Sequence, residues 1–452
     1  MKRLFRMLSS GEGLKARSLR GTLLTMISFG GTNVLRLGSN LILTRILFPE
    51  AFGMMALIQV FVTGMRMFSD TGIRTSIMQN PRGDDPNFLN TAWTMQIGRG
   101  ILLWLGTCAI ARPVAAIYNE PMLAQLLPVV GLGALISGFA PTKLATAGRH
   151  MLLGRTTAID LSTQAIGVVI MIVLAWLLQS VWALAIGGVI GSAVTLLAQY
   201  LYLPGIRNRL FWDKSAVRDL FHFGKFIFLS TAVTFVITQG DKAILGGYIS
   251  MAELGVYNIG YFLGSLPLVL MGVINGRIVF PLYRLKPISE SAENRRKIFR
   301  ARRIVMSGGL VITSILGFSG LALVDLMYDD RYALAGAVVV LMSLTMIPQL
   351  VIKTYGAVLL ASGDSRRFFI LNCATAVLQT GLMFAGVIWF GILGVMLAPA
   401  IAILLTNPLR IYYVRKYNAW DAKADSFFML TGFAITGTAC WLHWDEVAKL
   451  MW

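Results

Sequence analysis

The sequence predicts an all-α integral membrane protein with two six-helix lobes around a central cavity. Three observations lead to this prediction: long apolar runs, basic residues gathered between alternate runs, and similarity between the two halves of the chain. The 452 residues are 56% hydrophobic and 13% charged, whereas soluble domains carry about 25% charged residues. So large an apolar excess exceeds what soluble cores can bury, and we expect it to face lipid.

A membrane-spanning helix needs about 20 mostly apolar residues, and the chain holds twelve such runs. A membrane span must satisfy its own backbone hydrogen bonds, which favours helices. A thirteenth run, 426–442, is shorter and less apolar, and whether it spans is left open. Turn-forming residues separate runs at Pro49-Glu50, within 80–87, at 119–121 and at 363–365. The twelve runs cover residues 21–46, 51–78, 88–117, 122–145, 156–178, 181–203, 219–247, 253–283, 304–327, 333–360, 368–390 and 392–414.

Basic residues gather at the N-terminus and in every second connection, which accounts for the net charge of +19 without a nucleic-acid partner. The positive-inside rule then predicts a cytoplasmic N-terminus. The longest basic connection includes residues 288–303, ISESAENRRKIFRARR. We expect it to form an amphipathic helix on the cytoplasmic interface, where arginines can hold anionic headgroups, or else a solvated positive loop.

The two halves of the chain resemble each other. Leu43–Leu57 aligns with Leu245–Ile259 at an offset of 202 residues, which places Gly53 on Gly255. Six spans separate the copies, so both start on the same side, and such a parallel repeat places a transport site between the halves. The predicted organisation is a basic cytoplasmic N-terminus (1–20), an N-lobe (21–203), a cytoplasmic linker (204–218), a C-lobe (219–416) and a C-terminal extension (417–452).

Catalytic and metal-binding patterns are missing from the sequence. It contains no phosphate loop, no HExxH and no GxSxG motif, and its three histidines and three cysteines are scattered. We therefore expect a transporter rather than an enzyme, with no catalytic residue, no metal site and no cofactor.

Cationic residues inside the runs are the strongest site candidates. An arginine at the bilayer centre costs about 2.5–3.5 kcal/mol on insertion scales, so these residues should face water or protein. Guanidinium binds phosphate in a bidentate manner and keeps its charge, which favours an anionic ligand such as a diphosphate. Alternatively, Arg66 pairs with Asp70, and the long side chains of Arg99 and Lys353 reach the interface. The candidates are Arg36, Arg66, Arg99, Arg277 and Lys353.

Polar residues recur at helical spacing in several runs and either line the cavity or join helices by hydrogen bonds. The few acids inside the runs either balance neighbouring arginines or bind a coupling ion, H⁺ or Na⁺; the membrane potential is another possible driving force. The acids are Asp70, Asp160 and Asp241. The polar lining candidates are Thr32, Asn40, Gln59, Gln164, Thr234, Asn275 and Gln379, and Gln164 falls on Gln379 at an offset of 215 residues.

Four segments carry a family resemblance: LTRILFPEAFGMMAL (43–57), FSDTGIRTSIMQ (68–79), NTAWTMQIGRG (90–100) and QGDKAILGGYIS (239–250). They resemble the polysaccharide-transport flippases of the multidrug/oligosaccharidyl-lipid/polysaccharide exporter superfamily. The resemblance implies that alternating access moves an undecaprenyl-diphosphate-linked oligosaccharide from the cytoplasmic to the periplasmic leaflet, for exopolysaccharide, capsule or O-antigen synthesis. Its implied partners are the lipid-linked glycan, membrane lipids, a polysaccharide polymerase and chain-length proteins.

Three other functions stay open. A lipid II flippase and a multidrug cation antiporter share the same plan, and a non-transporting membrane assembly protein is a different class. The arginines inside the runs argue against a cation antiporter, and the duplication argues against a mere scaffold.

Overall fold

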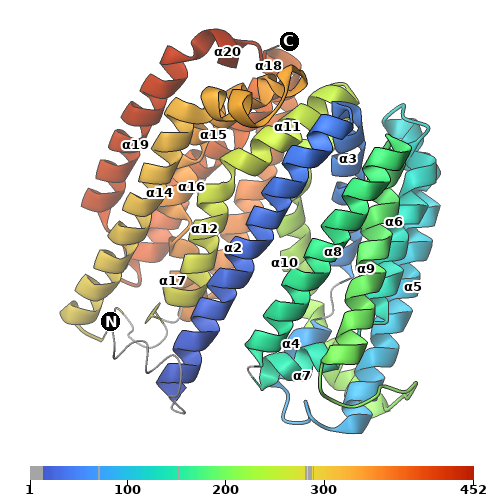
Figure 1. The fold of residues 1–452 in the computed structure, drawn as a ribbon. Coiled ribbons are helices and arrows are strands. Elements are labelled where there is room, and N and C mark those ends of the chain that lie inside the picture. The colour runs from blue at the N-terminus through green and yellow to red at the C-terminus, as the bar shows by residue number, and fades with distance from the viewer. Residues whose placement is uncertain are drawn as a thin grey trace, which may run out of the picture. The chain divides into compact units, whose positions relative to one another are not determined.

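The computed structural model describes residues 14–69, 72–150, 152–279, 282–283, 288 and 290–451. These residues form helices and contain no strand (Figure 1). In chain order the elements are α2 (Leu14–Ile46), α3 (Pro49–Phe68), α4 (Ile73–Gln79), α5 (Pro86–Ile117), α6 (Leu123–Gly138), α7 (Lys143–Arg149), α8 (Leu153–Leu178), α9 (Val181–Tyr202), α10 (Lys214–Leu245), α11 (Met251–Gly264), α12 (Leu266–Ile274), η1 (Asn275–Val279), α14 (Ala292–Met327), η2 (Asp330–Tyr332), α15 (Leu334–Thr345), α16 (Ile347–Ile352), α17 (Tyr355–Ala361), α18 (Ser365–Arg415), α19 (Ala422–Leu442) and α20 (Trp444–Ala448).

Each predicted apolar run coincides with one helix, with consecutive helices, or with one arm of α18. The predicted breaks are confirmed, since α3 begins at Pro49, α5 at Pro86 and α18 at Ser365. By length and composition, six of the described helices could cross a membrane, or nine if each of three bent pairs is one span. The all-helical membrane class is therefore confirmed, and the total of twelve spans plus one stays a prediction.

Local sequence sets where several helices begin. Ser250 and Glu253 form a reciprocal capping box at the start of α11, in which each side chain binds the other residue's backbone N–H. Asp85 accepts from the backbone of Asn87 at the start of α5, where Pro86 occupies the first turn. Proline is tolerated there because the first-turn N–H groups lack helical partners. The caps thus explain why these breaks were readable in the sequence.

The chain divides into two compact units that differ from the predicted lobe boundaries. Unit 1 comprises residues 1–47 and 58–232, and unit 2 comprises residues 48–57 and 233–452. The start of α3 therefore belongs to unit 2 and its remainder to unit 1. Outward-facing positions in both units carry large apolar side chains; Leu102 is 70% exposed and Leu326 is 81% exposed. Exposed apolar side chains of this size are expected where a protein surface contacts lipid.

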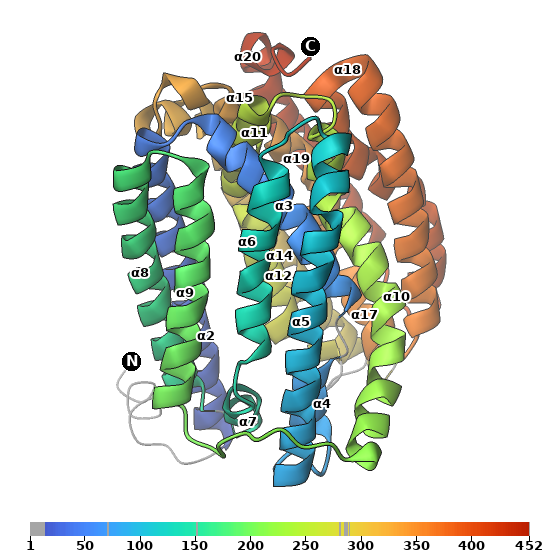
Figure 2. The same ribbon diagram turned by 90° about the vertical axis from the view of Figure 1, so that its right-hand side faces the viewer.

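Small residues let the helices of unit 1 pack closely. The Cα atoms of Gly100 on α5 and Gly138 on α6 face each other so closely that a Cβ atom on either would come within 2.9 Å of the opposite Cα. On α8 the amide of Gln164 donates to the Thr32 carbonyl of α2 at 3.2 Å. Figure 2 shows α5 beside α6 and α8 beside α9. Close backbone approach of this kind is the usual packing mode of membrane helices.

Unit 2 is built around α15, whose residues from Ala335 to Val340 are all nearly inaccessible. Glycines of the surrounding helices receive its side chains: Gly260 of α11 packs against Val338, and Gly320 of α14 packs against Val339. A helix that is apolar on all sides belongs at the centre of a bundle. The position of α15 thus follows from its composition.

The 51-residue α18 is an antiparallel pair rather than one straight helix. Gly391 has φ of 60° and ψ of −137°, which breaks the helix there. Gly386 and Gly394 pack backbone against backbone, and the hydroxyls of Thr375 and Thr406 lie 3.3 Å apart. In a straight helix those hydroxyls would be separated by about 46 Å. The prediction of two runs, 368–390 and 392–414, is therefore confirmed.

Whether residues 426–442 span the membrane stays open, because α19 is not among the described helices that are long and apolar enough to cross one. They lie in α19, whose 21 residues make a helix about 31 Å long, close to the roughly 30 Å hydrocarbon core of a bilayer. Near its start Asp425 binds Arg302, and after its end the Leu450 carbonyl accepts from the Leu393 backbone. Since α14 and α19 lie side by side along their length (Figure 1), α19 traverses the unit.

The expectation of an interfacial helix at 288–303 is wrong. Ser291 caps α14, which runs without a break from Ala292 to Met327, so this segment is the start of a long helix. Arg302 is fully buried, and its guanidinium binds Asp425 at 3.1 Å and stacks 3.9 Å from the centroid of the Tyr355 ring. Arg303 binds Asp421 at 2.8 Å. These two arginines form ion pairs with acids at the start of α19, rather than binding lipid headgroups.

Equivalent residues of the two repeats meet each other in unit 2. A Cβ atom on Gly53 of α3 would lie 1.8 Å from the Met251 oxygen, and one on Gly255 of α11 would lie 2.0 Å from the Pro49 oxygen. Gly53 and Gly255 are 202 residues apart, as are Pro49 and Met251. Reciprocal contact between equivalent residues is the mark of two-fold symmetry. The contact supports the internal duplication inferred from the sequence.

Candidate functional site

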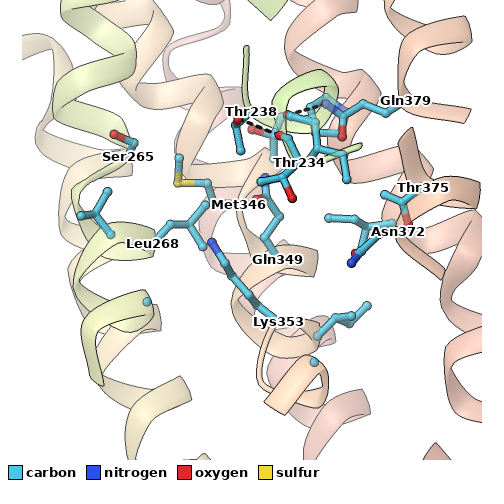
Figure 3. Close-up of a pocket in the computed structure, with 18 of the residues that line it drawn as sticks. Thr234, Thr238, Ser265, Leu268, Met346, Gln349, Lys353, Asn372, Thr375 and Gln379 are labelled. Atoms are coloured by element: carbon cyan, nitrogen blue, oxygen red, sulfur yellow. Dashed lines mark hydrogen bonds between the residues drawn. The ribbon is translucent and has the colours of Figure 1, made fainter. Parts of the chain in front are cut away.

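A cavity of about 720 Å³ lies within unit 2. Residues of α10, α11, α12, η1, α15, α16, α17 and α18 line it, so it opens between the helices that surround the bundle centre (Figure 3). Most of its lining is apolar, with hydroxyl and amide groups spaced along the walls. This mixture is typical of sites for organic ligands.

Five residues predicted from the sequence line this one cavity: Thr234, Asp241, Asn275, Lys353 and Gln379. Helices α11 and α12 meet at 43° immediately before Pro267, and a π-helical turn, η1, follows at Asn275. Proline and π-helical turns are established causes of such kinks. The kink gives the polar residue Asn275 its place in the wall.

Gln379 joins two walls of the cavity. Its amide nitrogen donates to the Ile237 carbonyl of α10 at 2.9 Å, and the side chain is 2% exposed. On the next residue of α10, the Thr238 hydroxyl donates to the Thr234 carbonyl at 2.8 Å, as Figure 3 shows. Gln164 makes the same kind of bond to α2 in unit 1. The two glutamines therefore hold equivalent helix pairs together, and Gln379 also lines the cavity.

One end of the cavity is acidic. Asp241 is buried, and its Oδ2 accepts a hydrogen bond from the Tyr257 hydroxyl at 2.6 Å. Its other oxygen, Oδ1, has no hydrogen-bond partner in the described part of the chain. Among the described lining residues, Asp241 is the only acid.

The other end of the cavity is cationic. Lys353 reaches into it from the end of α16, and Asn372 points into it from α18 (Figure 3). Arg410 of α18 also lines it and is only 8% exposed. Its Nη1 and the Oδ1 of Asn275 are buried and hydrogen-bond nothing among the residues that the structure describes. Buried polar atoms without partners call for an explanation such as a ligand or water.

The sequence analysis missed Arg410, although a signal existed. It lies five residues before the end of α18, where arginines commonly reach the membrane surface with their long side chains. The register of α18 shows otherwise: the Thr375–Thr406 pair places Arg410 level with Leu371, one residue from Asn372. An arginine inside an apolar run, four residues from a threonine, was the available clue.

The two charged ends lie far apart. Along α18, Leu371 precedes Gln379 by eight residues, or about 12 Å. Along α10, Asp241 follows Ile237, the partner of Gln379, by four residues, or about 6 Å. Asp241 and Arg410 are thus separated by roughly 18 Å along the helix axes, which is too far for an ion pair.

The predicted cationic residues of the first repeat lie in unit 1. The side chains of Arg36 on α2 and Arg66 on α3 are exposed, as is Gln59, while Thr32 and Asn40 are half-buried. Asp160 is exposed on α8. All of Asp70 and the side chain of Arg277 lie outside the described residues, so the Arg66–Asp70 pair and the role of Arg277 in binding an anion stay predictions.

Arg99 has a structural task in unit 1. Its guanidinium donates to the Ser69 hydroxyl at 2.9 Å and to the Arg66 carbonyl at 2.8 Å, at the end of α3. Cations are favourable at helix C-termini, where carbonyl groups lack partners. On the same helix Gln96 donates to the Ser137 and Ala140 carbonyls at 3.2 Å each, at the end of α6.

The rest of the 90–100 segment holds the connection before α10. The Asn90 side chain accepts from the backbone of Arg209 at 3.0 Å, and the Thr94 hydroxyl accepts from Phe211 at 3.0 Å. The Thr91 hydroxyl accepts from the backbone of Asp213 at 3.1 Å. The polar residues of NTAWTMQIGRG are therefore explained by helix capping and by fixing residues 209–213.

Basic connections gather at one end of each unit. In unit 1, Arg82 binds Asp85 at 3.0 Å and Asp213 at 2.9 Å, which ties the α4–α5 connection to the one before α10. In unit 2, the Tyr417 hydroxyl donates to Asp364 at 2.7 Å. This grouping agrees with the predicted alternation, and the side of the membrane stays a prediction. No group of three or more possible metal-binding side chains occurs in the described ranges.

Sequence comparison identifies relatives in bacterial polysaccharide synthesis. A family model described as polysaccharide biosynthesis protein matches residues 42–335. The teichuronic acid biosynthesis protein TuaB of Bacillus subtilis (strain 168) is 18% identical over 70% of this chain and 66% of its own length. The succinoglycan biosynthesis transport protein ExoT of Rhizobium meliloti (strain 1021) is 23% identical over 57% and 52%. The lipopolysaccharide biosynthesis protein WzxC of Escherichia coli (strain K12) is 23% identical over 54% and 49%. The matches span between about half and two thirds of these relatives' lengths.

Solved structures share the fold at low sequence identity. The lipid II flippase MurJ in an inward closed conformation has a TM-score of 0.69 at 13% identity, covering 92% of both chains. An inward-facing multidrug resistance MATE transporter of the MOP superfamily has a TM-score of 0.65 at 13% identity, covering 85% of this chain and 94% of its own. With the family match over most of the chain, these findings show that this multi-pass membrane protein belongs to the polysaccharide biosynthesis protein family.

Proposed function

We propose that this protein is a flippase that moves an undecaprenyl-diphosphate-linked oligosaccharide from the cytoplasmic to the periplasmic leaflet of the bacterial inner membrane. The main observation that supports this proposal is the cavity of unit 2, where hydroxyl and amide groups line walls that also hold Lys353 and Arg410. Sugar hydroxyls match the first set of groups, and phosphate oxygens match the cations. The family match supports a role in polysaccharide synthesis.

Transport proceeds by alternating access in this proposal, with the acyl chain in lipid and the sugar in the polar interior. Arg36, Arg66 and Arg277 remain proposed ligands of the diphosphate. The α11–α12 kink at Pro267 and the π-helical turn give the wall of unit 2 a place to bend. Asp241, whose Oδ1 hydrogen-bonds to no residue that the structure describes, is the strongest candidate for H⁺ or Na⁺ coupling, and Asp160 and Asp70 are further candidates.

The orientation belongs to the same proposal. The N-terminus and the basic ends of both units lie in the cytoplasm, because their arginines and lysines resist transfer. A cysteine placed at Glu290 should resist a membrane-impermeant thiol reagent added to intact cells, whereas one placed at Asp330 should react. Rapid labelling at Glu290 from outside would reverse the orientation.

A deletion strain tests the function. Loss of the gene should abolish surface polysaccharide and leave lipid-linked oligosaccharide in the inner leaflet, and the wild-type gene should restore export. Arg36→Ala and Arg277→Ala should abolish export while the protein remains inserted, and lysine at either position should restore it partly. Arg415→Ala, which removes an exposed arginine, serves as the matched control.

Other outcomes identify the alternatives. Full export by both alanine variants would contradict a role of these arginines in substrate binding. Accumulation of lipid II with cell lysis would assign the protein to peptidoglycan synthesis. Normal polysaccharide with increased sensitivity to cationic drugs would indicate an antiporter. Physical association with a polymerase or a chain-length protein is a further expectation, which affinity purification from native membranes can check.

A further inference from the structure

The cationic end of the unit 2 cavity has the composition and geometry of a built anion site. We propose that Arg410 and Lys353, with the amides of Asn275 and Asn372, bind the phosphate groups of the lipid-linked substrate inside unit 2. This inference rests on the proposed function and adds Arg410, which lies on a different helix from every arginine singled out in the sequence. Three observations support it. The four residues lie at a similar height along the cavity, Arg410 has no acidic partner within unit 2, and two buried polar atoms have no hydrogen-bond partner among the described residues.

The four residues lie at one level of the cavity. The α17 and α18 helices touch where Gly356 meets the Phe368 ring, with 3.2 Å between that ring and a Cβ atom built on Gly356. Lys353 precedes Gly356 by three residues, and Leu371, level with Arg410, follows Phe368 by three. Because the two segments run in opposite senses along the cavity, Lys353 and Arg410 lie about one turn beyond this contact in the same direction.

Asn275 reaches the same level from η1. Val279, four residues later, packs in a buried cluster with Tyr355 and Val358, so Asn275 lies about one turn above that cluster. Asn372 is adjacent to the level of Arg410 and points into the cavity (Figure 3). Two cations and two amides from η1, α18 and the end of α16 therefore lie at about one level of the cavity.

Arg410 lacks a counter-charge within unit 2. No ion pair involves it among the described residues, and Asp241, the acid of the same cavity, is roughly 18 Å away along the helix axes. The residues of unit 2 that the structure leaves undescribed contain no aspartate or glutamate. A buried arginine without an acid is costly, and an anionic ligand is the partner that its geometry fits best.

The unpartnered atoms show what the ligand must offer. The buried Nη1 of Arg410 needs an acceptor, which a phosphate oxygen supplies. The buried Oδ1 of Asn275 needs a donor, which a sugar hydroxyl next to the phosphate supplies. A diphosphate joined to a sugar satisfies both needs, whereas an ammonium group can donate to Asn275 but offers no acceptor for Arg410.

Binding to the purified full-length protein in nanodiscs tests the site by isothermal titration calorimetry. The probes are farnesyl diphosphate, inorganic pyrophosphate and farnesol. We expect Arg410→Met to weaken farnesyl diphosphate binding at least tenfold and Lys353→Met at least threefold. Arg410→Lys should retain part of the affinity, and Arg415→Met, the matched control on the same helix, should stay within twofold of the wild type. Equal affinity for pyrophosphate would indicate a site for the phosphate group alone, and a strong preference for farnesyl diphosphate would indicate a site for the lipid-linked form.

Thermal stability separates a binding role from a structural one. If Arg410 is kept for a ligand, Arg410→Met should melt at the same temperature as the wild type or higher without ligand, because it removes an unpaired buried charge. Unchanged binding in Arg410→Met, or lower stability in both Arg410→Met and Arg410→Lys, would overturn the proposal. The binding assay needs no glycan, so its result does not depend on export. If Arg410→Met weakens binding but the wild-type gene does not restore polysaccharide in the deletion strain, the proposed function is refuted and the proposed anion site stands.

Discussion

The crossing of α3 and α11 permits a quantitative test of how the two repeats pack. A Cβ atom added at Gly53 would lie 1.8 Å from the Met251 carbonyl oxygen, whereas ordinary contact begins at 3.4 Å. Gly53→Ala therefore requires the two backbones to separate by about 1.6 Å, the difference between these two distances. The obstacle is a main-chain atom, which cannot rotate away as a flexible side chain would.

The expected magnitude follows from two opposing effects. Alanine is favoured over glycine inside a helix by about 1 kcal/mol, and overpacking a core costs about 1–3 kcal/mol. Because the clash is with backbone, we place the cost at the upper end of that range, so the net destabilisation is about 2 kcal/mol. For a domain of this size that corresponds to a fall in melting temperature of roughly 4–8 °C.

Heating followed by fluorescence-detected size-exclusion chromatography measures this change in detergent. Gly437→Ala in α19 is the matched control, since a Cβ atom there meets no atom within 4 Å, and it should match or exceed the wild type. Gly53→Ala with Gly255→Ala should cost less than the two single changes together, because both open the same gap. Equal stability of Gly53→Ala and Gly437→Ala, or full additivity in the double variant, would refute this account of the crossing.

Two further predictions concern charged groups at the basic ends. Arg302→Met should destabilise unit 2 by about 3–5 kcal/mol because Arg302 is fully buried and its loss removes the hydrogen bonds that it makes to Asp425 and Tyr355, whereas Arg303→Met removes a guanidinium that is 53% exposed and should cost about 1 kcal/mol; similar melting temperatures for both variants would contradict this. The hydrogen bonds of Arg82 and Ser215 lower the pKa of Asp213 from 3.8 to about 2, so its stabilisation is complete above pH 3.8 and is lost as the pH falls toward 2. Wild type and Asp213→Asn should therefore differ in melting temperature at pH 6 and converge near pH 2, and a difference that persists at pH 2 would count against the pairing.

The class of the protein and the extent of its helices could be predicted because membrane insertion depends on local composition. Each apolar run must satisfy its own backbone, so its boundaries appear in the sequence as caps and turns, such as Pro49 and Ser365. The repeat was also readable, since Gly53 and Gly255 remain glycine at a constant offset. The prediction of an interfacial helix failed because composition alone could not show that Arg302 is buried and binds an acid 123 residues away.

The sequence correctly predicted cavity residues that are charged and lie inside apolar runs. It missed a charged residue that lies near a helix end, where charged residues are common. Lys353 and Asp241 stand out inside apolar runs, and both line the cavity. Arg410 lies near a helix end, where an arginine normally reaches the interface, so its burial was invisible without the register of α18. Arg99 was predicted as a ligand for the same reason as Arg36, yet its hydrogen bonds to the end of α3 exist only once α5 packs there.

The sequence by itself determined the helical membrane class, the breaks between helices and the duplication, because these depend on interactions between residues near in the chain or on composition. The tertiary structure decided which polar groups remain available. Gln379 and Arg302 bind partners on neighbouring helices, while Arg410 and Asp241 each keep a buried atom without a partner in the described residues. A polar side chain has no fixed role until packing decides whether a donor or acceptor from another helix reaches it.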